Sequence, residues 1–182
     1  EYGVRSGMPM FKAKELCPQL IIKPVDFHYY GALSREFMAF VKSYTPKIEI
    51  ASVDECYADF TEVVKGKKDV KAFFIELQNQ LFSKTKLKCS IGVASTKFLA
   101  KMGSDYKKPM GLTIIRKKDI PTILYPLPIK DMFGVGKKTA PRLEKMGIKT
   151  IGDFAIKAKV DDAMTMDALG KFYFVLKDWI NG

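Results

Sequence analysis

Apolar residues recur at helical spacing in two long segments of the chain. Intervals of three and four place them on one face of each segment, at Tyr30, Leu33, Phe37, Val41 and Tyr44 and at Val70, Phe73, Phe74, Leu77 and Leu81. This periodicity predicts amphipathic helices over residues 30–44 and 70–81, each packed on a core by its apolar face. A short helix is predicted over residues 11–17, because Pro18 disfavours helical backbone in the residue before it.

Shorter apolar runs predict strands. In residues 47–61 apolar and polar positions alternate up to a polar centre and aromatic residues follow, which indicates a β-hairpin. The runs at 89–94 and 112–115 are typical of buried strands, and a brief run at 20–22 is compatible with another. Ser95 or Thr96 can cap a helix that continues to Tyr106.

The pattern changes at residues 116–119. No strand pattern follows, and short helical pieces are interrupted by Pro121, Pro126, Pro128, Gly134, Gly136, Gly147 and Gly152. We therefore expect an α+β fold with three parts: a turn-rich segment at 1–25, a mixed β-sheet packed by two helices at 26–117, and a small all-α part at 118–182.

Positive charge is concentrated in one third of the chain. The net charge is +11, and residues 97–149 hold 13 Lys or Arg against 4 Asp or Glu, a balance of +9. Such a concentration favours a polyanionic partner, because Lys and Arg contacts release counterions from nucleic acid. The alternative is a set of solvated lysines on ordinary surfaces.

The remaining composition excludes several classes. The three cysteines, Cys17, Cys56 and Cys89, are far apart and form no CxxC pair, so neither a zinc site nor a disulfide framework is indicated. No apolar run approaches the length of a membrane span, and we expect a cytoplasmic protein. The chain opens at Glu1 without Met, which suggests a piece of a longer protein.

Asp54 and Glu55 stand side by side at the tip of the predicted hairpin. Adjacent like charges repel, and a divalent cation would stabilise them. Neighbouring strand residues face opposite sides, so both acids reach one cation only if the hairpin bends or Glu55 reaches across the turn. The alternative is a solvated acidic tip.

A second candidate site lies in Phe-Gly-Val-Gly-Lys-Lys-Thr-Ala at residues 133–140. Glycines let the backbone bring N–H groups against a phosphate, and lysines and a helix N-terminus add positive charge. The pattern resembles the helix-hairpin-helix motif, which holds a DNA backbone without reading bases. The candidate contacts are Gly134, Gly136, Lys137, Lys138 and Thr139. An ordinary turn between two helices is the alternative.

Four blocks of the sequence resemble one enzyme family. Residues 52–59, Ser-Val-Asp-Glu-Cys-Tyr-Ala-Asp, resemble the Ser-hydrophobic-Asp-Glu-x-Tyr-x-Asp signature of the Y-family, or translesion, DNA polymerases. Residues 2–18, 90–111 and 129–154 are similar, in the same order, to the fingers, second palm block and thumb of that family. The resemblance implies partial fingers at 1–25, a catalytic palm at 26–117 and a thumb at 118–182.

The resemblance also implies roles for single residues. Asp54 would bridge two Mg²⁺ ions, and Glu55 would bind the ion that activates the primer 3′-hydroxyl. Lys108 would contact the incoming triphosphate, and Arg5, Ser6 and Gly7 would line a roof over the templating base. The implied partners are primer–template DNA, a dNTP and, for a longer protein, a sliding clamp.

The chain also departs from the family pattern. A first catalytic Asp on an upstream strand, a Tyr and an Arg that hold the triphosphate, and a C-terminal little-finger domain have no counterpart here. We therefore expect this piece to be inactive by itself, with one strand missing from its sheet. Lys101 lies one helical turn from Asp105, and the sequence leaves open whether it contacts DNA or pairs with that acid.

Two other functions compete with a polymerase. A nucleotide cyclase with a palm-like sheet also uses an acidic hairpin, but such enzymes carry Gly-Gly before the acids, where this chain has Ser52 and Val53. A non-catalytic DNA-binding module would bind DNA in a salt-dependent way, unaffected by Mg²⁺ or by Asp54→Ala.

Overall fold

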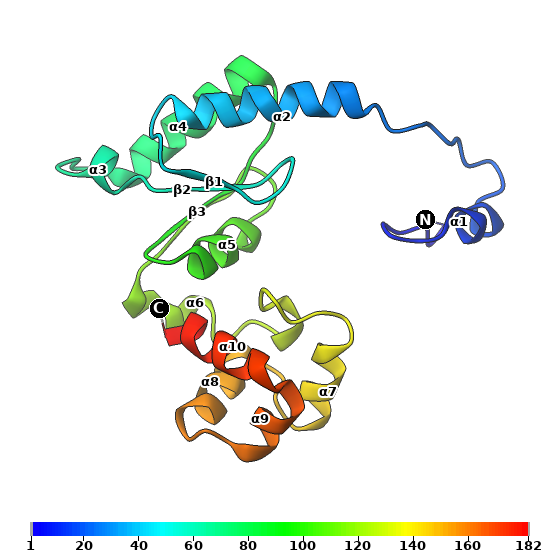
Figure 1. Ribbon diagram of the computed structural model, residues 1–182, viewed down its shortest axis with the longest axis vertical. Helices are drawn as coiled ribbons and strands as arrows, with labels where there is room; N and C mark the ends of the chain where they lie inside the picture. Colours follow the sequence, from blue (N-terminus) through cyan, green and yellow to red (C-terminus); the bar gives the residue numbers. More distant parts are fainter. Residues whose placement is uncertain (1, 182) are drawn as a thin grey trace.

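The computed structural model describes residues 2–181. Helices and strands alternate over the first two thirds, and helices alone follow β4 among the described elements (Figure 1). In chain order these elements are α1 Met10–Leu16, α2 Phe27–Lys42, β1 Ile48–Ile50, β2 Cys56–Ala58, α3 Thr61–Val64, α4 Val70–Thr85, β3 Ile91–Ala94, α5 Lys97–Tyr106, β4 Leu112–Ile115, η1 Lys117–Asp119, α6 Ile120–Ile123, η2 Ile129–Asp131, α7 Thr139–Lys145, α8 Ile151–Lys159, α9 Ala163–Leu169 and α10 Lys171–Asn181.

The strands form two separate pairs. β1 and β2 are antiparallel, with Ile48 opposite Ala58, and β3 and β4 are parallel, with Ile91 opposite Leu112. Within the described part of the chain no ladder joins the two pairs. The α+β prediction is confirmed, and the sheet expected as one unit is divided because no strand lies between β2 and β3.

Helices α2 and α4 pack together over these strands (Figure 1). The aspartates at their N-caps fix where they begin, since Asp26 accepts from Tyr29 N–H and Asp69 from Ala72 N–H, both at 2.9 Å. Buried side chains of the two helices share one core cluster: Phe40, Val41, Phe74, Leu77 and Leu81. The two long amphipathic helices predicted from apolar spacing are therefore confirmed.

Helix α5 packs closely on β3. A Cβ atom on Gly92 would lie 1.8 Å from the Ala100 carbonyl oxygen, so only glycine allows this approach. The Thr96 hydroxyl caps the helix by accepting from Leu99 N–H at 3.3 Å. The other side of α5 belongs to the core of the C-terminal helices, because Phe98, Leu99 and Met102 lie in their buried cluster. Helix α5 thus joins the strands to the helical region.

The C-terminal helices enclose a largely apolar centre. Leu143, Phe154 and Leu176 are completely buried there. Tyr173 is also buried, and its hydroxyl donates to Asp161 at 3.0 Å. Burial, together with the Asp161 charge, raises the pKa of Tyr173 to about 12. The region after β4 is a layer of short helices that shares its core with α5, and its all-α character is the one that the Pro and Gly pattern predicted.

The N-terminal segment stands apart from the rest in Figure 1. Helix α1 confirms the short helix predicted before Pro18, and extended chain connects it to α2. The strand predicted at 20–22 is wrong: it has no partner strand, and Ile21 is 81% exposed. No helix within residues 2–181 has the length and apolar character needed to cross a membrane.

Candidate active site and nucleic-acid interface

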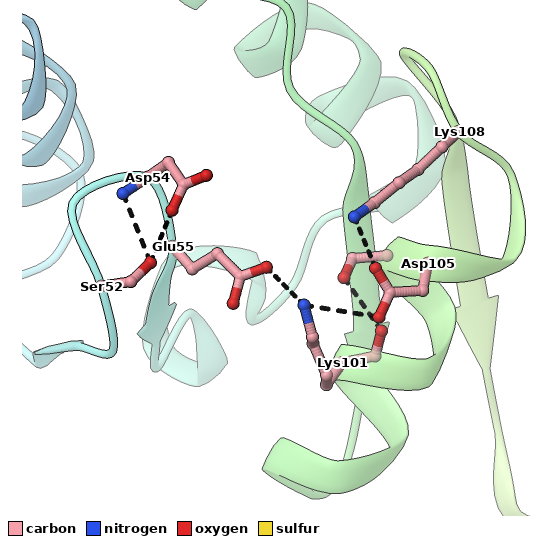
Figure 2. A network of polar contacts seen from close by, with 7 residues as sticks. Ser52, Asp54, Glu55, Lys101, Asp105 and Lys108 are labelled. Atoms are coloured by element: carbon pink, nitrogen blue, oxygen red, sulfur yellow. Dashed lines mark hydrogen bonds and ion pairs between the residues drawn. The ribbon is translucent and has the colours of Figure 1, made fainter. Parts of the chain in front are cut away.

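The tip of the β1–β2 hairpin is bent by its own hydrogen bonds. The N–H groups of Ala51 and Ser52 both donate to the Glu55 carbonyl, at 3.0 and 3.1 Å. The Ser52 hydroxyl donates to Asp54 Oδ1 at 2.6 Å. Figure 2 shows the result: Asp54 stays against Ser52, while the Glu55 side chain extends from the hairpin toward α5.

On the α5 side, Lys101 forms an ion pair with Glu55. Its ammonium forms ion pairs with Glu55 and, at 3.4 Å, with Asp105 one turn along the helix. The Lys101 side chain is only 15% exposed. Burial lowers the pKa of Lys101, but hydrogen bonding to Glu55 and the nearby Asp105 charge outweigh it, so the pKa lies above its ordinary value. Lys101 thus pairs with Asp105, one of the two roles that the sequence left open.

Asp105 connects Lys101 to Lys108. Lys108 Nζ lies 2.6 Å from Asp105 Oδ1, so Glu55, Lys101, Asp105 and Lys108 form one continuous row of alternating charges (Figure 2). The i, i+4 spacing of Lys101 and Asp105 is visible in the sequence. Their link to Glu55 is not, because it joins residues 46 positions apart.

A cavity of about 1060 Å³ opens beside this row. Residues of β2 and β3 line it from the two strand pairs, and Phe74, Leu77 and Leu81 of α4 contribute apolar surface. Asp54, Glu55, Lys101 and Lys108 also line it, so charged groups and apolar surface face the same space.

Two cysteines line the same cavity. Burial raises the pKa of Cys56 and of Cys89 to about 11, and the charge of Cys89 adds to the shift at Cys56. Both thiols are therefore protonated at neutral pH and behave as small apolar groups.

The acidic pair offers part of a metal site. Carboxylate oxygens are the ligands that Mg²⁺ prefers, and Asp54 and Glu55 supply them at the cavity. Across residues 2–181, however, no three His, Cys, Asp or Glu side chains are grouped to hold an ion. The donor chemistry fits a divalent cation, and the number of donors does not complete its shell.

The segment at residues 133–138, called the glycine–lysine turn below, lies between η2 and α7. Val135 is buried and anchors the turn, while Gly136, Lys137 and Lys138 are exposed. The Thr139 N–H donates to the Gly136 carbonyl at 3.0 Å, so this N–H is already used within the turn. Besides Phe133 and Gly134, the exposed residues of the turn are therefore Gly136, Lys137 and Lys138.

Two features of the structure require glycine at position 134. Its φ is +92°, and a Cβ atom there would lie 2.7 Å from the Phe172 ring. The glycine is needed both for its backbone conformation and for the packing of α10 against the turn.

The structure brings together only some of the predicted site residues. Asp54, Glu55 and Lys108 share the cavity. Arg5, Ser6 and Gly7 form an exposed turn in the separate N-terminal segment (Figure 1). The glycine–lysine turn lies in the helical region, on the other side of α5 from the strands (Figure 1).

Comparison with protein families covers most of the chain. Residues 1–105 match the impB/mucB/samB family, and residues 117–148 match the helix-hairpin-helix motif of the same family. The helix-hairpin-helix reading of the glycine–lysine turn is thereby confirmed as a motif.

The relatives with similar sequences are longer than this chain. DNA polymerase IV of Bacillus velezensis is 43% identical over 180 residues, which is 99% of this chain and 42% of the relative. DNA polymerase IV 1 of Bacillus subtilis is 45% identical over 84% of this chain and 37% of the relative. The chain thus spans well under half the length of these relatives.

Solved structures share the fold. The insertion ternary complex of Dbh DNA polymerase matches with a TM-score of 0.81 and 32% identity, over 98% of this chain and 52% of that one. DinB from Sulfolobus solfataricus matches with a TM-score of 0.79 and 32% identity, over 97% and 52%. The chain therefore belongs to the impB/mucB/samB family, and its resemblance to the Y-family DNA polymerases is confirmed.

Proposed function

We propose that this chain forms the catalytic palm, thumb and part of the fingers of a translesion DNA polymerase that adds dNTPs to a primer 3′-hydroxyl. The boundaries are those of the sequence pattern: fingers at 1–25, palm at 26–117 and thumb at 118–182. The observation that carries the proposal is the row Glu55–Lys101–Asp105–Lys108, which borders the large cavity beside the acidic hairpin (Figure 2). The protein would act in the cytoplasm.

The acidic hairpin would hold the metal ions. Asp54 and Glu55 would each give carboxylate oxygens to Mg²⁺, with Asp54 shared between two ions. Two such ions would stabilise the attacking and leaving oxygens of an in-line phosphoryl transfer. The bend at Ser52 supports this role, because it places both acids at the cavity although they are adjacent in sequence.

Lys108 would bind the triphosphate of the incoming nucleotide. It lines the cavity, its side chain is more than half exposed, and its partner in this structure is a carboxylate. A triphosphate is a stronger anionic partner than Asp105, so Lys108 could exchange one for the other by a side-chain rotation. Asp105 would then keep Lys108 at the cavity until the nucleotide arrives.

An extended segment would complete the palm. β2 and β3 both line the cavity, and among residues 2–181 no strand pairs with either across it, while buried apolar residues form part of its wall. A strand there would pair with both edges, and a carboxylate on it would supply the donor that the hairpin lacks. Such a strand belongs to the family pattern upstream of the fingers.

The remaining contacts would hold DNA. Gly134, Gly136, Lys137, Lys138 and Thr139 form the motif that would grip the backbone of primer–template DNA, mainly through the exposed part at 136–138. Arg5, Ser6 and Gly7 would cover the templating base when DNA is bound. A sliding clamp would recruit the full-length protein.

The decisive experiment uses a chimera in which this chain replaces the matching residues of the Bacillus velezensis relative. Primer extension by the chimera should require Mg²⁺, and Asp54→Ala should reduce it by at least about 10³-fold, because removing a shared metal ligand removes electrostatic stabilisation of the transition state. The matched control is Glu49→Gln, an acid of the same hairpin that pairs with Lys97. It should extend within about twofold of the unmodified chimera.

Other results would support other functions. Extension that survives Asp54→Ala would contradict the metal assignment. DNA binding without extension, unaffected by Mg²⁺, would favour the non-catalytic DNA-binding module. Formation of a cyclic nucleotide from a nucleoside triphosphate would favour the cyclase.

A further inference from the structure

The chain has a single tryptophan, and it stacks between two parts of the molecule. The Trp179 ring of α10 lies 5.3 Å from the Phe98 ring of α5, at an interplanar angle of 21°. Its distance to the Phe133 ring, at the start of the glycine–lysine turn, is 5.7 Å and the angle is 25°. Trp179 therefore contacts both α5 and the turn through its ring.

The turn is fixed to α5 by a second contact. The Phe133 N–H donates to Met102 Sδ at 3.2 Å, and Met102 is one helical turn from Phe98. At Gly134 the turn packs closely against α10, since a Cβ atom there would lie 2.7 Å from Phe172 and 3.1 Å from Trp179. The Trp179 stack and the hydrogen bond from Phe133 to Met102 thus both connect the turn to α5.

The same helix carries the charged row of the candidate active site. Lys101 and Asp105 project from α5 toward the acidic hairpin and Lys108 (Figure 2). Phe98 and Met102 occupy an adjoining face of α5 and lie in the core of the helical region. One ten-residue helix thus contacts the turn on one face and the acidic hairpin on another.

We propose that Trp179 is a positioning residue that fixes the DNA-gripping turn to α5, and so sets where the DNA backbone lies relative to Asp54 and Glu55. This inference rests on the proposed polymerase function. Trp179 itself touches neither substrate nor metal. Its effect comes from stacking, which holds rigid rings in a defined offset arrangement.

The consequence is a separation of DNA affinity from reaction rate. Lys137 and Lys138 supply most of the charge at the turn, and they remain when Trp179 is removed. Reaction rate depends on placing the primer end within about 1 Å of its productive position, and a misplacement of that size costs up to about 10²-fold. Loss of Trp179 should therefore affect rate far more than affinity.

The test compares Trp179→Ala, Trp179→Phe and Phe174→Ala in the Bacillus velezensis chimera. Phe174 is an exposed aromatic residue on the same helix and serves as the matched control. Circular dichroism and thermal melting first establish that each variant is folded. At saturating DNA and nucleotide, Trp179→Ala should extend at least about tenfold more slowly, with a DNA Kd within about threefold of the parent. Trp179→Phe should recover most of the rate, and Phe174→Ala should match the parent.

A second readout does not depend on activity. Hydrogen exchange of the 182-residue chain should show that Trp179→Ala accelerates exchange at residues 97–106 and 133–138 by about tenfold, with α2 and α4 unchanged. If Trp179→Ala fails to fold, Phe133→Ala takes its place, because Phe133 is partly exposed at the edge of the stack.

The outcomes distinguish a failure of the proposed polymerase function from a failure of the positioning role of Trp179. A parent chimera that does not extend primers contradicts the proposed function, whatever the exchange data show. A parent that extends, with Trp179→Ala folded and equally fast, overturns the positioning role. Equal losses of rate and DNA affinity would also overturn it, since Trp179 would then affect only the binding of DNA by the turn.

Discussion

Lys101 has surroundings unlike those of an ordinary surface lysine, because its side chain is largely buried. It lies between two carboxylates from different elements, Glu55 of the hairpin and Asp105 of its own helix. Lys97, one turn earlier on α5, pairs with Glu49 of the same hairpin, but there both side chains are about 60% exposed. Exposed pairs contribute little to stability, because solvent screens the charges. The two lysines thus form a natural comparison.

We expect Lys101→Met to lower the free energy of unfolding by about 1 kcal/mol, and Lys97→Met by at most about 0.5 kcal/mol. The first substitution leaves Glu55 and Asp105 without their shared partner, while the second frees an already solvated acid. Urea denaturation of the 182-residue chain measures both. Equal effects of the two substitutions would show that burial adds nothing to the Lys101 pairs.

At the scale of elements, local hydrogen bonds fix where short helices begin. Helix α8 begins with a reciprocal cap: the Thr150 hydroxyl accepts from Asp153 N–H at 3.0 Å, and Asp153 accepts from Thr150 N–H at 2.8 Å. The backbone hydrogen bond from Thr150, with a further one from Lys149, lowers the pKa of Asp153. The cap is at full strength only while Asp153 is ionised.

Asp153→Asn should lower the free energy of unfolding by about 1 kcal/mol at pH 7. Because the pKa of Asp153 is depressed in the folded state, its contribution is present above its unfolded pKa of about 3.9 and is lost as pH falls through the folded value. The difference between parent and variant should therefore shrink below about pH 4. Urea denaturation at several pH values measures it, with the exposed Asp167→Asn as control. A difference that persists unchanged at pH 3 would contradict the ionised cap.

The glycine–lysine turn is the element that the proposed function needs for DNA. The double substitution Lys137→Ala with Lys138→Ala should weaken binding equally for all sequences and reduce the slope of log K against log salt by about 1.8, the loss expected for two phosphate contacts. Fluorescence anisotropy with duplexes of different sequence measures both. The control is Lys67→Ala with Lys68→Ala, an adjacent exposed pair just before α4. A loss that depends on base sequence would contradict backbone binding.

For the whole molecule, the division of the sheet into two pairs is the dominant feature. The hairpin side and the β3 side face each other across the cavity, and both pack against the buried core of α2 and α4. Lys97 and Lys101 of α5 add ion pairs to Glu49 and Glu55 of the hairpin. The helical region shares a second buried core with α5, so this helix contacts all three parts.

We expect hydrogen exchange at residues 56–58 and 91–94 to be at least about tenfold slower in the Bacillus velezensis chimera than in the 182-residue chain. A strand placed between β2 and β3 would use the edge groups that now face the cavity. Exchange in α4 serves as the internal control and should change little. The 182-residue chain alone should bind DNA but not extend a primer. Equal protection of β2 and β3 in both proteins would show that the cavity takes no strand.

Most elements up to β4 could be predicted from the sequence, whereas α3 and the bounds of α8, α9 and α10 could not. Apolar spacing indicated α2 and α4, Pro18 the end of α1, and Ser95 or Thr96 the start of α5. These signals are local, because they depend on residues a few positions apart. The strand predicted at 20–22 was wrong, since a strand exists only where a partner strand accepts its hydrogen bonds.

The candidate site depends on contacts that local sequence signals do not predict. The sequence by itself determined the composition of the site: two adjacent acids, a lysine before Pro109 and a glycine–lysine turn, each a short pattern with its own chemistry. Only the tertiary structure decided that Glu55 leaves Asp54 and pairs with Lys101, that the two strand pairs remain apart, and that Trp179 joins α5 to the turn. These contacts join residues about 40 or more positions apart. They depend on how layers pack against each other, which no short pattern encodes.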